Sequence, residues 1–298
     1  MFSTLKRSLQ YHFRKSENLR AYTLLSPTLL IIILTMGVPL VMSVVYSFWT
    51  QFYLEIDKTF TLANYIKFFD RPIYIELIKR SMKISGMVTL VTILTAYPIA
   101  YYVAFHVKKN KIFWIILMTL PFWTSYLLRV FAWKLILGYE GIINGSLIKL
   151  GLISEPIAVL LHSPEAVVIT LAHAWAAFAV LPIFVSLDNI DKSYLEASAD
   201  LGHGPVSSFL RVTLPLSMPG VISAALVIFI PTVADYVTPS LVGGPDGRMV
   251  ANLIQILYGR GNDWPMGSAL SLMMIIYISA VCGTFILIAR ILRRGGMG

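Results

Sequence analysis

Long apolar runs alternate with short polar segments along this chain. A helix needs about 20 apolar residues to cross the roughly 30 Å hydrocarbon core of a membrane. Six runs come close to or exceed that length with few charges inside them, so we predict a membrane-spanning helix in each. They lie at about residues 22–48, 84–105, 112–131, 166–186, 219–239 and 267–289.

The composition indicates the same environment. Hydrophobic residues make up 57% of the 298 residues and charged residues only 13%, whereas soluble domains contain about 25% charged residues. A soluble protein of this length has no use for so much apolar surface, so we expect an all-α, multi-pass membrane protein. The sequence contains no internal repeat and no low-complexity linker, and we expect residues 1–298 to form a single membrane domain.

Lys and Arg are unevenly distributed between the polar segments. The chain's beginning, the segment after the second run, residues 188–218 and the tail together have a net charge of +8, and the opposite segments have +2. Loops rich in Lys and Arg stay in the cytoplasm, so we predict that both termini and residues 188–218 are cytoplasmic. Attraction to anionic membrane lipid accounts for the overall charge of +9, and no nucleic-acid partner is implied.

One external segment has helical spacing outside the predicted spans. Leu62, Tyr65, Ile66 and Phe69 form an apolar stripe at intervals of three and four residues. This spacing predicts a short helix. The helix could lie along the membrane interface or pack on the neighbouring spans.

The polar segment 188–218 has the sequence of a helical hairpin. Ser193 and Glu196 have the spacing of a capping box, in which each side chain bonds a free backbone amide at a helix start. Gly202 suits the left-handed end of that helix. We expect a second short helix over residues 205–212 that ends before Leu214–Pro215.

The same segment resembles the EAA loop of ABC importer permeases. The family pattern is Glu-Ala-Ala, three residues, Gly, nine residues, then Ile, any residue, Leu and Pro. This chain has every spacing, with Ser198 for the last Ala and Val212 for Ile. The resemblance implies a type I ABC importer permease fold and a loop that docks on a nucleotide-binding subunit. The matching loop residues are Glu196, Ala197, Ser198, Gly202, Leu214 and Pro215.

A separate chain would have to hydrolyse ATP. The phosphate loop Gly-x-x-x-x-Gly-Lys-Ser/Thr does not occur in this sequence, and neither do the common zinc-hydrolase or serine-nucleophile motifs. We therefore expect no catalytic site and no cofactor here, with ATP and Mg²⁺ on a partner ATPase. The resemblance further implies a second permease, a periplasmic substrate-binding protein and the bacterial inner membrane.

Two other classes of membrane protein are weaker alternatives. An ion-coupled secondary transporter is expected to have paired ionisable residues in its spans and internal symmetry, and the sequence has one acid in a span and no repeat. A membrane-embedded enzyme needs a nucleophile or metal constellation, which we did not find.

Among the residues of the predicted spans, Asp235 has the highest free-energy cost of insertion into a bilayer. A carboxylate deep in a bilayer costs about 2.5–3.5 kcal/mol on insertion scales. Pro231 and Pro239 flank it, so the helix around it should be bent or interrupted. Asp235 could therefore line a water-filled path, or it could lie near the outer boundary and cap the following turn.

Three strings, at residues 121–129, 235–244 and 262–265, are similar to the spermidine/putrescine permease group. This narrower resemblance implies a polyamine as the solute, and a permease for another small solute is the alternative. The implied substrate path contains Asp235, Tyr236, Trp123 and Tyr126, which could offer a cation one carboxylate and several aromatic faces. Arg129 argues against a cationic solute unless it pairs with an acid or points outward.

Overall fold

The structure, a computed structural model, describes residues 17–53, 55–157, 160 and 162–295 of the chain. Most of the described residues are helical. Two short strands, β1 (Thr50–Phe52) and β2 (Glu55–Asp57), form an antiparallel hairpin in which Thr50 lies opposite Asp57. The all-α membrane fold predicted from the sequence is confirmed.

The helices of the first half of the chain include one long helix, α5. They are α2 (Glu17–Ile32), a π-helical segment η1 (Ile33–Gly37), α3 (Val38–Ser47), α4 (Ala63–Asp70), α5 (Pro72–Phe105), α6 (Lys111–Thr119), a 3₁₀ turn η2 (Leu120–Trp123), α7 (Tyr126–Leu137) and α8 (Ile142–Lys149).

The helices of the second half alternate between long and short. They are α9 (Pro164–Asp188), α10 (Lys192–Asp200), α11 (Pro205–Ser208), a π-helical segment η4 (Phe209–Thr213), α12 (Leu214–Val233), α13 (Val237–Val242), α14 (Val250–Tyr258) and α15 (Trp264–Gly295).

Five of the six predicted spans correspond to single helical stretches that are long and apolar enough to cross a membrane. Within the described residues these are Ala21–Ser47, Pro72–Phe105, Pro164–Asp188, Pro205–Val233 and Trp264–Leu287.

The third predicted span, 112–131, is not one straight helix. It consists of two stretches, Lys111–Trp123 and Tyr126–Lys149, that meet at 80°. Pro121 has no amide hydrogen to continue the helical ladder, and the Thr124 hydroxyl caps the broken turn by donating to the Pro121 carbonyl at 2.8 Å. Thr124 itself has an extended backbone. The apolar run predicted a membrane segment correctly, but not the bend.

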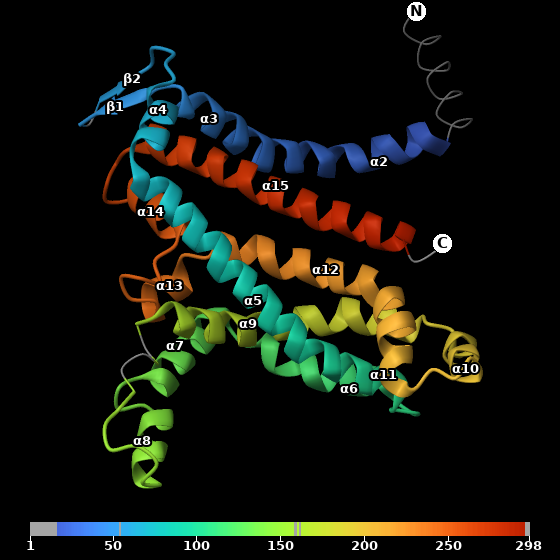
Figure 1. Cartoon of the computed structure of the whole chain (residues 1–298). Helices are drawn as coiled ribbons and strands as arrows, with labels where there is room; N and C mark the ends of the chain where they lie inside the picture. The colour runs from blue at the N-terminus through green and yellow to red at the C-terminus, as the bar shows by residue number, and fades with distance from the viewer. Residues whose placement is uncertain (1–16, 54, 158–159, 161, 296–298) are drawn as a thin grey trace, which may run out of the picture.

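The core of the molecule is the contact between α5, α9 and α12 (Figure 1). Gly220 of α12 lies so close to α9 that a Cβ there would overlap the Pro182 carbonyl oxygen and the Ser186 side chain. The Tyr97 and Ser217 hydroxyls join α5 to α12 by a 2.8 Å hydrogen bond inside this contact. Small side chains and backbone approach set helix spacing in a membrane, because lipid provides no hydrophobic force between helices.

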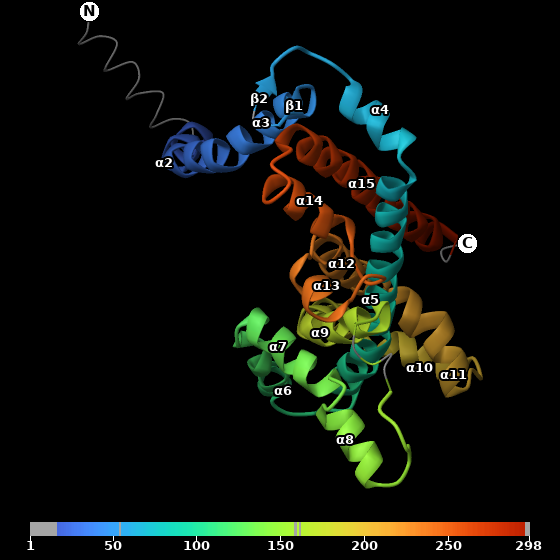
Figure 2. The ribbon, with the colours of Figure 1, turned by 90° about the vertical axis from the view of Figure 1, so that its left-hand side faces the viewer.

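The first span lies against α15 and is separate from that core (Figure 2). None of its apolar window is buried in this chain. Large apolar side chains such as Leu24, Leu30 and Val41 are exposed along its length. This surface has the composition of one that contacts lipid or other membrane helices.

The two ends of the bundle are different. The start of α2, the end of α15 and the α10–α11 pair lie at one end, and the β-hairpin, α4, α13 and α14 lie at the other (Figure 1). The segments that the distribution of Lys and Arg assigns to one side of the membrane therefore lie at one end of the bundle. That the α10–α11 end faces the cytoplasm stays a prediction.

The short external helix is confirmed as α4, but the face that packs on the protein differs from the apolar stripe. Asn64 and Phe68 are buried, whereas Leu62, Ile66 and Phe69 are exposed. Asn64 donates hydrogen bonds to the Ser47 and Trp49 carbonyls. Tyr65 of the stripe is half-buried, and its hydroxyl donates to the Ser47 hydroxyl at 2.8 Å. Leu62, Ile66 and Phe69 therefore face away from the spans, as expected of a helix that lies along an interface, whereas Tyr65 packs on the end of the first span.

Candidate substrate path and coupling loop

The first helix of the loop begins two residues earlier than its sequence predicts. Asp191, and not Ser193, is the N-cap residue of α10, because its carboxylate accepts the Ser193 backbone N–H at 3.0 Å. The capping box between Ser193 and Glu196 is therefore wrong. The hydrogen bond holds the pKa of the exposed Asp191 carboxyl below its usual value, because it favours the charged form.

The outer face of α10 is open to a partner. Glu196 and Ala197 are exposed, and Leu201, just after the helix, is 78% exposed. Ser198 is different, since its side chain is buried against the protein itself and its hydroxyl has no hydrogen-bond partner among the described residues. Ser198 thus supports the loop from inside and does not form part of its exposed surface.

Gly202 ends the first helix as predicted. Its φ is +78°, a conformation that side chains with a Cβ rarely adopt. Gly204 has an ordinary φ of −68° and leads into Pro205, the first residue of α11.

The second helix of the loop does not end before Leu214–Pro215. It widens into the π-helical segment η4, where the Leu214 N–H bonds the Phe209 carbonyl five residues back. The helix then continues as α12 with Pro215 in its first turn. A proline normally clashes with the carbonyl four residues earlier, and the wider π turn at Arg211 relieves that conflict. Residues 205–233 therefore form one continuous helical stretch.

Asp235 lies just beyond the fifth span and not within it. The helix α12 ends at Val233, and α13 begins at Val237. The Asp235 Oδ1 atom accepts the Val237 backbone N–H at 2.9 Å across this interruption. Asp235 therefore caps the following turn, as one alternative predicted, and the predicted continuation of the span to residue 239 is wrong.

The second carboxylate oxygen of Asp235 contacts a different span. The Tyr126 hydroxyl donates to the Asp235 Oδ2 atom at 2.5 Å. Its oxygen also lies 2.5 Å from the Thr238 hydroxyl, which donates to it because the phenol proton is already engaged. Tyr126 is the first residue of α7, so this network joins the bend in the third span to the break after the fifth.

A cavity of about 340 Å³ opens beside this network. Its lining residues are Tyr126, Arg129, Ala174, Trp175, Phe178, Pro231 and Asp235. Arg129 does not pair with an acid within the described residues. Its guanidinium donates to the Ala174 carbonyl at 3.3 Å and lies over the Phe122 ring at 5.2 Å.

Two residues of the implied path lie apart from this cavity. Trp123 is 86% exposed and does not line it. Tyr236 is exposed too, and its contribution is a backbone carbonyl that accepts from Asn252 at 2.8 Å and from the Ser240 hydroxyl at 2.7 Å. Sequence reasoning missed both Thr238 and Asn252. Thr238 is three residues after an acid that follows a helix, which is a signal that could have been used.

The helical hairpin and the cavity beside Asp235 suit a protein that moves a solute better than one that reacts with it. The α10–α11 pair lies at one end of the bundle, and the break between α12 and α13 lies near the other (Figure 1). The Asp235 carboxylate of this break lies beside the cavity. One continuous helix connects the two ends. The arrangement is that of a membrane transport subunit.

Comparison with known families identifies the class. Residues 23–295 match the family of binding-protein-dependent transport system inner membrane components. The match covers most of the chain, which therefore belongs to this family and is a multi-pass inner-membrane permease of an ABC importer.

The chain is similar to several named permeases. It is 31% identical over 239 residues to the spermidine/putrescine transport system permease protein PotB of Escherichia coli K12, covering 80% of this chain and 86% of that one. It is 32% identical over 247 residues to the inner membrane ABC transporter permease protein YdcU of the same organism, covering 78% and 77%.

A solved structure supports the fold independently. A chain of a bacterial ABC transporter involved in the import of the acidic polysaccharide alginate superimposes with a TM-score of 0.72 at 15% identity. The match covers 95% of this chain and 98% of that one. At this identity the likeness concerns the fold alone.

Proposed function

We propose that this chain forms half of the solute path of an ATP-driven importer for polyamines of the spermidine and putrescine type. The observation that carries the proposal is the position of Asp235, whose carboxylate lies beside an aromatic-walled cavity in a chain similar to PotB. Polyamines are flexible chains with several ammonium groups, so a path for them needs negative charge and aromatic faces.

The cavity provides both kinds of contact. Asp235 supplies the carboxylate, and Tyr126, Trp175 and Phe178 supply aromatic rings. An ammonium group over such a ring gains roughly 0.5–2 kcal/mol, depending on how far it is desolvated. A passing ammonium would compete with the Tyr126 hydroxyl for the carboxylate, so the solute itself would loosen the contact between α7 and the break.

The proposed partners follow from the missing ATP-binding motif of this sequence and from the exposed face of α10. The sequence has no phosphate loop, so ATP and Mg²⁺ would bind a separate ATPase that docks on the exposed face of α10. A second permease would complete the path, and a periplasmic binding protein would deliver the solute. ATP would then shift a two-state equilibrium between inward-facing and outward-facing forms.

Uptake of radiolabelled spermidine into polyamine-deficient cells tests the proposal. Asp235→Asn keeps the size of the side chain and removes its charge, and we expect initial uptake to fall by roughly tenfold or more. Asp246→Asn is the matched control, because Asp246 is an exposed acid that does not line this cavity. Unchanged uptake by Asp235→Asn at equal expression, or no uptake of spermidine or putrescine by the wild type, would reject it.

One observation favours a second candidate. Arg129 lines the same cavity as Asp235 without an acidic partner among the described residues, and opposite charges in one cavity suit a solute that has both an amino and a carboxylate group. Competition of unlabelled zwitterions against labelled spermidine separates the candidates. The second requires them to compete at lower concentration than putrescine does.

A further inference from the structure

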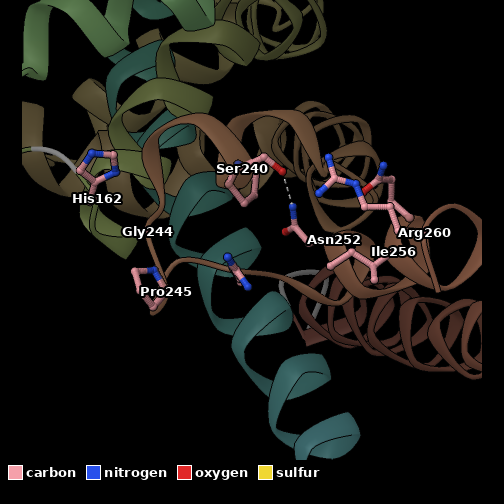
Figure 3. Close-up of a pocket in the computed structure, with 10 residues that line it drawn as sticks. His162, Ser240, Gly244, Pro245, Asn252, Ile256 and Arg260 are labelled. Atoms are coloured by element: carbon pink, nitrogen blue, oxygen red, sulfur yellow. Dashed lines mark hydrogen bonds between the residues drawn. The ribbon is translucent and has the colours of Figure 1, made fainter.

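Figure 3 shows a second cavity, of about 540 Å³. The helices α13 and α14 that form its walls lie at the end of the molecule opposite to α10 and α11 (Figure 1). The loop between them and the segment before α9 complete the cavity. Its polar lining residues are His162, Ser240, Arg248, Asn252, Gln255 and Arg260.

The charge of this cavity is positive. Arg248 and Arg260 are exposed, and neither forms an ion pair or a hydrogen bond within the described part of the chain. No acidic residue lines the cavity, since Asp246 lines its neighbours instead. Two guanidinium groups with open donors select carboxylates or phosphates and repel ammonium groups.

Close backbone contacts hold the walls in place. Gly244 has a φ of +60°, and a Cβ there would overlap the His162 carbonyl oxygen. Arg80 of α5 donates to the Pro245 carbonyl at 3.2 Å, and the Ser81 hydroxyl accepts the Val250 N–H at 2.8 Å. These contacts hold the walls of the cavity against α5 and the segment before α9.

The same cavity is connected to the Asp235 break. Asn252 donates from its side-chain nitrogen to the Ser240 hydroxyl at 2.8 Å (Figure 3). It also donates to the Tyr236 carbonyl at 2.8 Å. Tyr236 directly follows Asp235 in the chain. Any ligand that moves Ser240 or Asn252 therefore acts on the backbone next to the carboxylate that binds Tyr126.

We propose that this cavity accepts carboxylate side chains from the surface of the periplasmic binding protein, and that docking there acts on the Asp235 break through Asn252. The inference rests on the proposed function for its partner. A polyamine is excluded as the occupant because its charge has the wrong sign. The charge distribution predicts that this end faces the periplasm, where a soluble binding protein arrives.

The test uses the whole transporter in nanodiscs of zwitterionic lipid, with the purified solute-binding protein of the same system as the probe. We expect the double variant Arg248→Glu, Arg260→Glu to weaken binding of that protein at least tenfold, and high salt to weaken binding of the wild type. Lys149→Glu is the control, because Lys149 is an exposed cation on α8 that does not line the cavity. We expect it to change affinity less than twofold.

A second variant tests the connection to the break. Asn252→Ala should lower the stimulation of ATP hydrolysis by that protein at least fivefold, measured with the binding protein at saturation because Asn252 also lines the cavity. A purely structural role would instead reduce recovery of the assembled complex, which size-exclusion chromatography measures for every variant.

The inference is overturned if the double variant binds like the wild type or if Lys149→Glu weakens binding equally. It is also overturned if the double variant loses the second permease, or if anionic lipid in the nanodisc competes with the binding protein. Failure of the proposed function is separate. A wild-type transporter that binds the protein and hydrolyses ATP but imports no polyamine would reject the solute and leave the docking cavity standing.

Discussion

The Tyr126 hydroxyl and the Asp235 carboxylate are 109 residues apart in sequence and 2.5 Å apart in space. Their hydrogen bond joins two interruptions in membrane helices, the bend between α6 and α7 and the break between α12 and α13. Each interruption frees backbone groups that cannot remain unpaired in lipid. A membrane protein accepts such defects where they line a cavity, and these two line the same one.

Tyr126→Phe should lower spermidine uptake by roughly tenfold, because a hydrogen bond to a charged group contributes about 1.5–3 kcal/mol. The substitution keeps the ring and removes the donor to Asp235. Tyr139→Phe removes an exposed hydroxyl and should leave uptake unchanged. Equal initial rates for Tyr126→Phe and wild type would mean that the contact has no part in transport.

Gly220→Ala should destabilise the protein by about 1–3 kcal/mol, as overpacking of a tight contact does. The new methyl group would overlap the Pro182 carbonyl oxygen of α9. Thermal unfolding in detergent measures the change. Gly86→Ala is the control in α5, since a Cβ at Gly86 meets nothing within 4 Å, and a midpoint as low as that of Gly220→Ala would contradict the explanation.

Gly202→Val should weaken co-purification of the ATPase, because a β-branched residue at a φ of +78° strains the end of α10 by at least about 1–2 kcal/mol. Gly204→Val should have little effect, since its backbone is ordinary and both sites are open. Asn tolerates the left-handed region, so Gly202→Asn should restore much of the complex. Recovery of ATPase with Gly202→Val at the wild-type level would refute this role.

Ser198→Ala should keep or raise stability. The Ser198 hydroxyl is buried without a partner in the described residues, and such a group costs about 1–3 kcal/mol. Alanine also restores the residue that the EAA pattern has at this position. Ser193→Ala, at an exposed site on the same helix, should be neutral, and a lower melting temperature for Ser198→Ala alone would show that its hydroxyl is satisfied.

The cap of α10 should depend on pH only in acid. The Ser193 N–H holds the pKa of the Asp191 carboxyl below its usual value, so the cap stabilises the helix at every pH above the ordinary Asp value of about 3.9. Its contribution disappears as the pH falls through the lower folded-state value.

Hydrogen exchange of the α10 amides, corrected for intrinsic rates, measures this dependence. We expect constant protection from pH 8 to pH 5 and a loss below about pH 4. Asp191→Asn keeps an acceptor that does not titrate and should remove the acid-dependent loss, whereas Asp191→Ala should be poorly protected throughout. A loss of protection near neutral pH in the wild type would contradict the assignment.

The sequence was sufficient where one local property decides the structure. Length and hydropathy predicted the spans, because crossing lipid requires an uninterrupted apolar run. Gly202 predicted a helix end, because few other residues adopt its backbone conformation. The EAA spacing indicated the family, and the family match confirms it.

The sequence-based predictions were wrong at positions where contacts with neighbouring residues or segments decide the local structure. Pro215 normally marks a helix boundary, but the π turn before it lets the helix continue. Ser193 had the spacing of a cap, but Asp191 was already in place with a better acceptor. The hydrogen bond between Tyr126 and Asp235 could not be predicted from the sequence around either residue. It depends on the 80° bend in the third span, and nothing in the continuous apolar run at 112–131 indicates that bend.

The uninterrupted helix from Pro205 to Val233 has a mechanical consequence. Measured along its axis, its 29 residues cover about 43 Å at 1.5 Å per residue, from the turn after Gly202 to within two residues of Asp235, and the helix changes direction between α11 and α12 (Figure 1). Because its backbone hydrogen bonds continue through the change of direction, α11 and α12 form a bent lever, and we expect a push on α11 to reach the far end without any relay of side-chain contacts. The π-helical segment η4 joins α11 to α12, and its wider turn is where we expect this lever to bend.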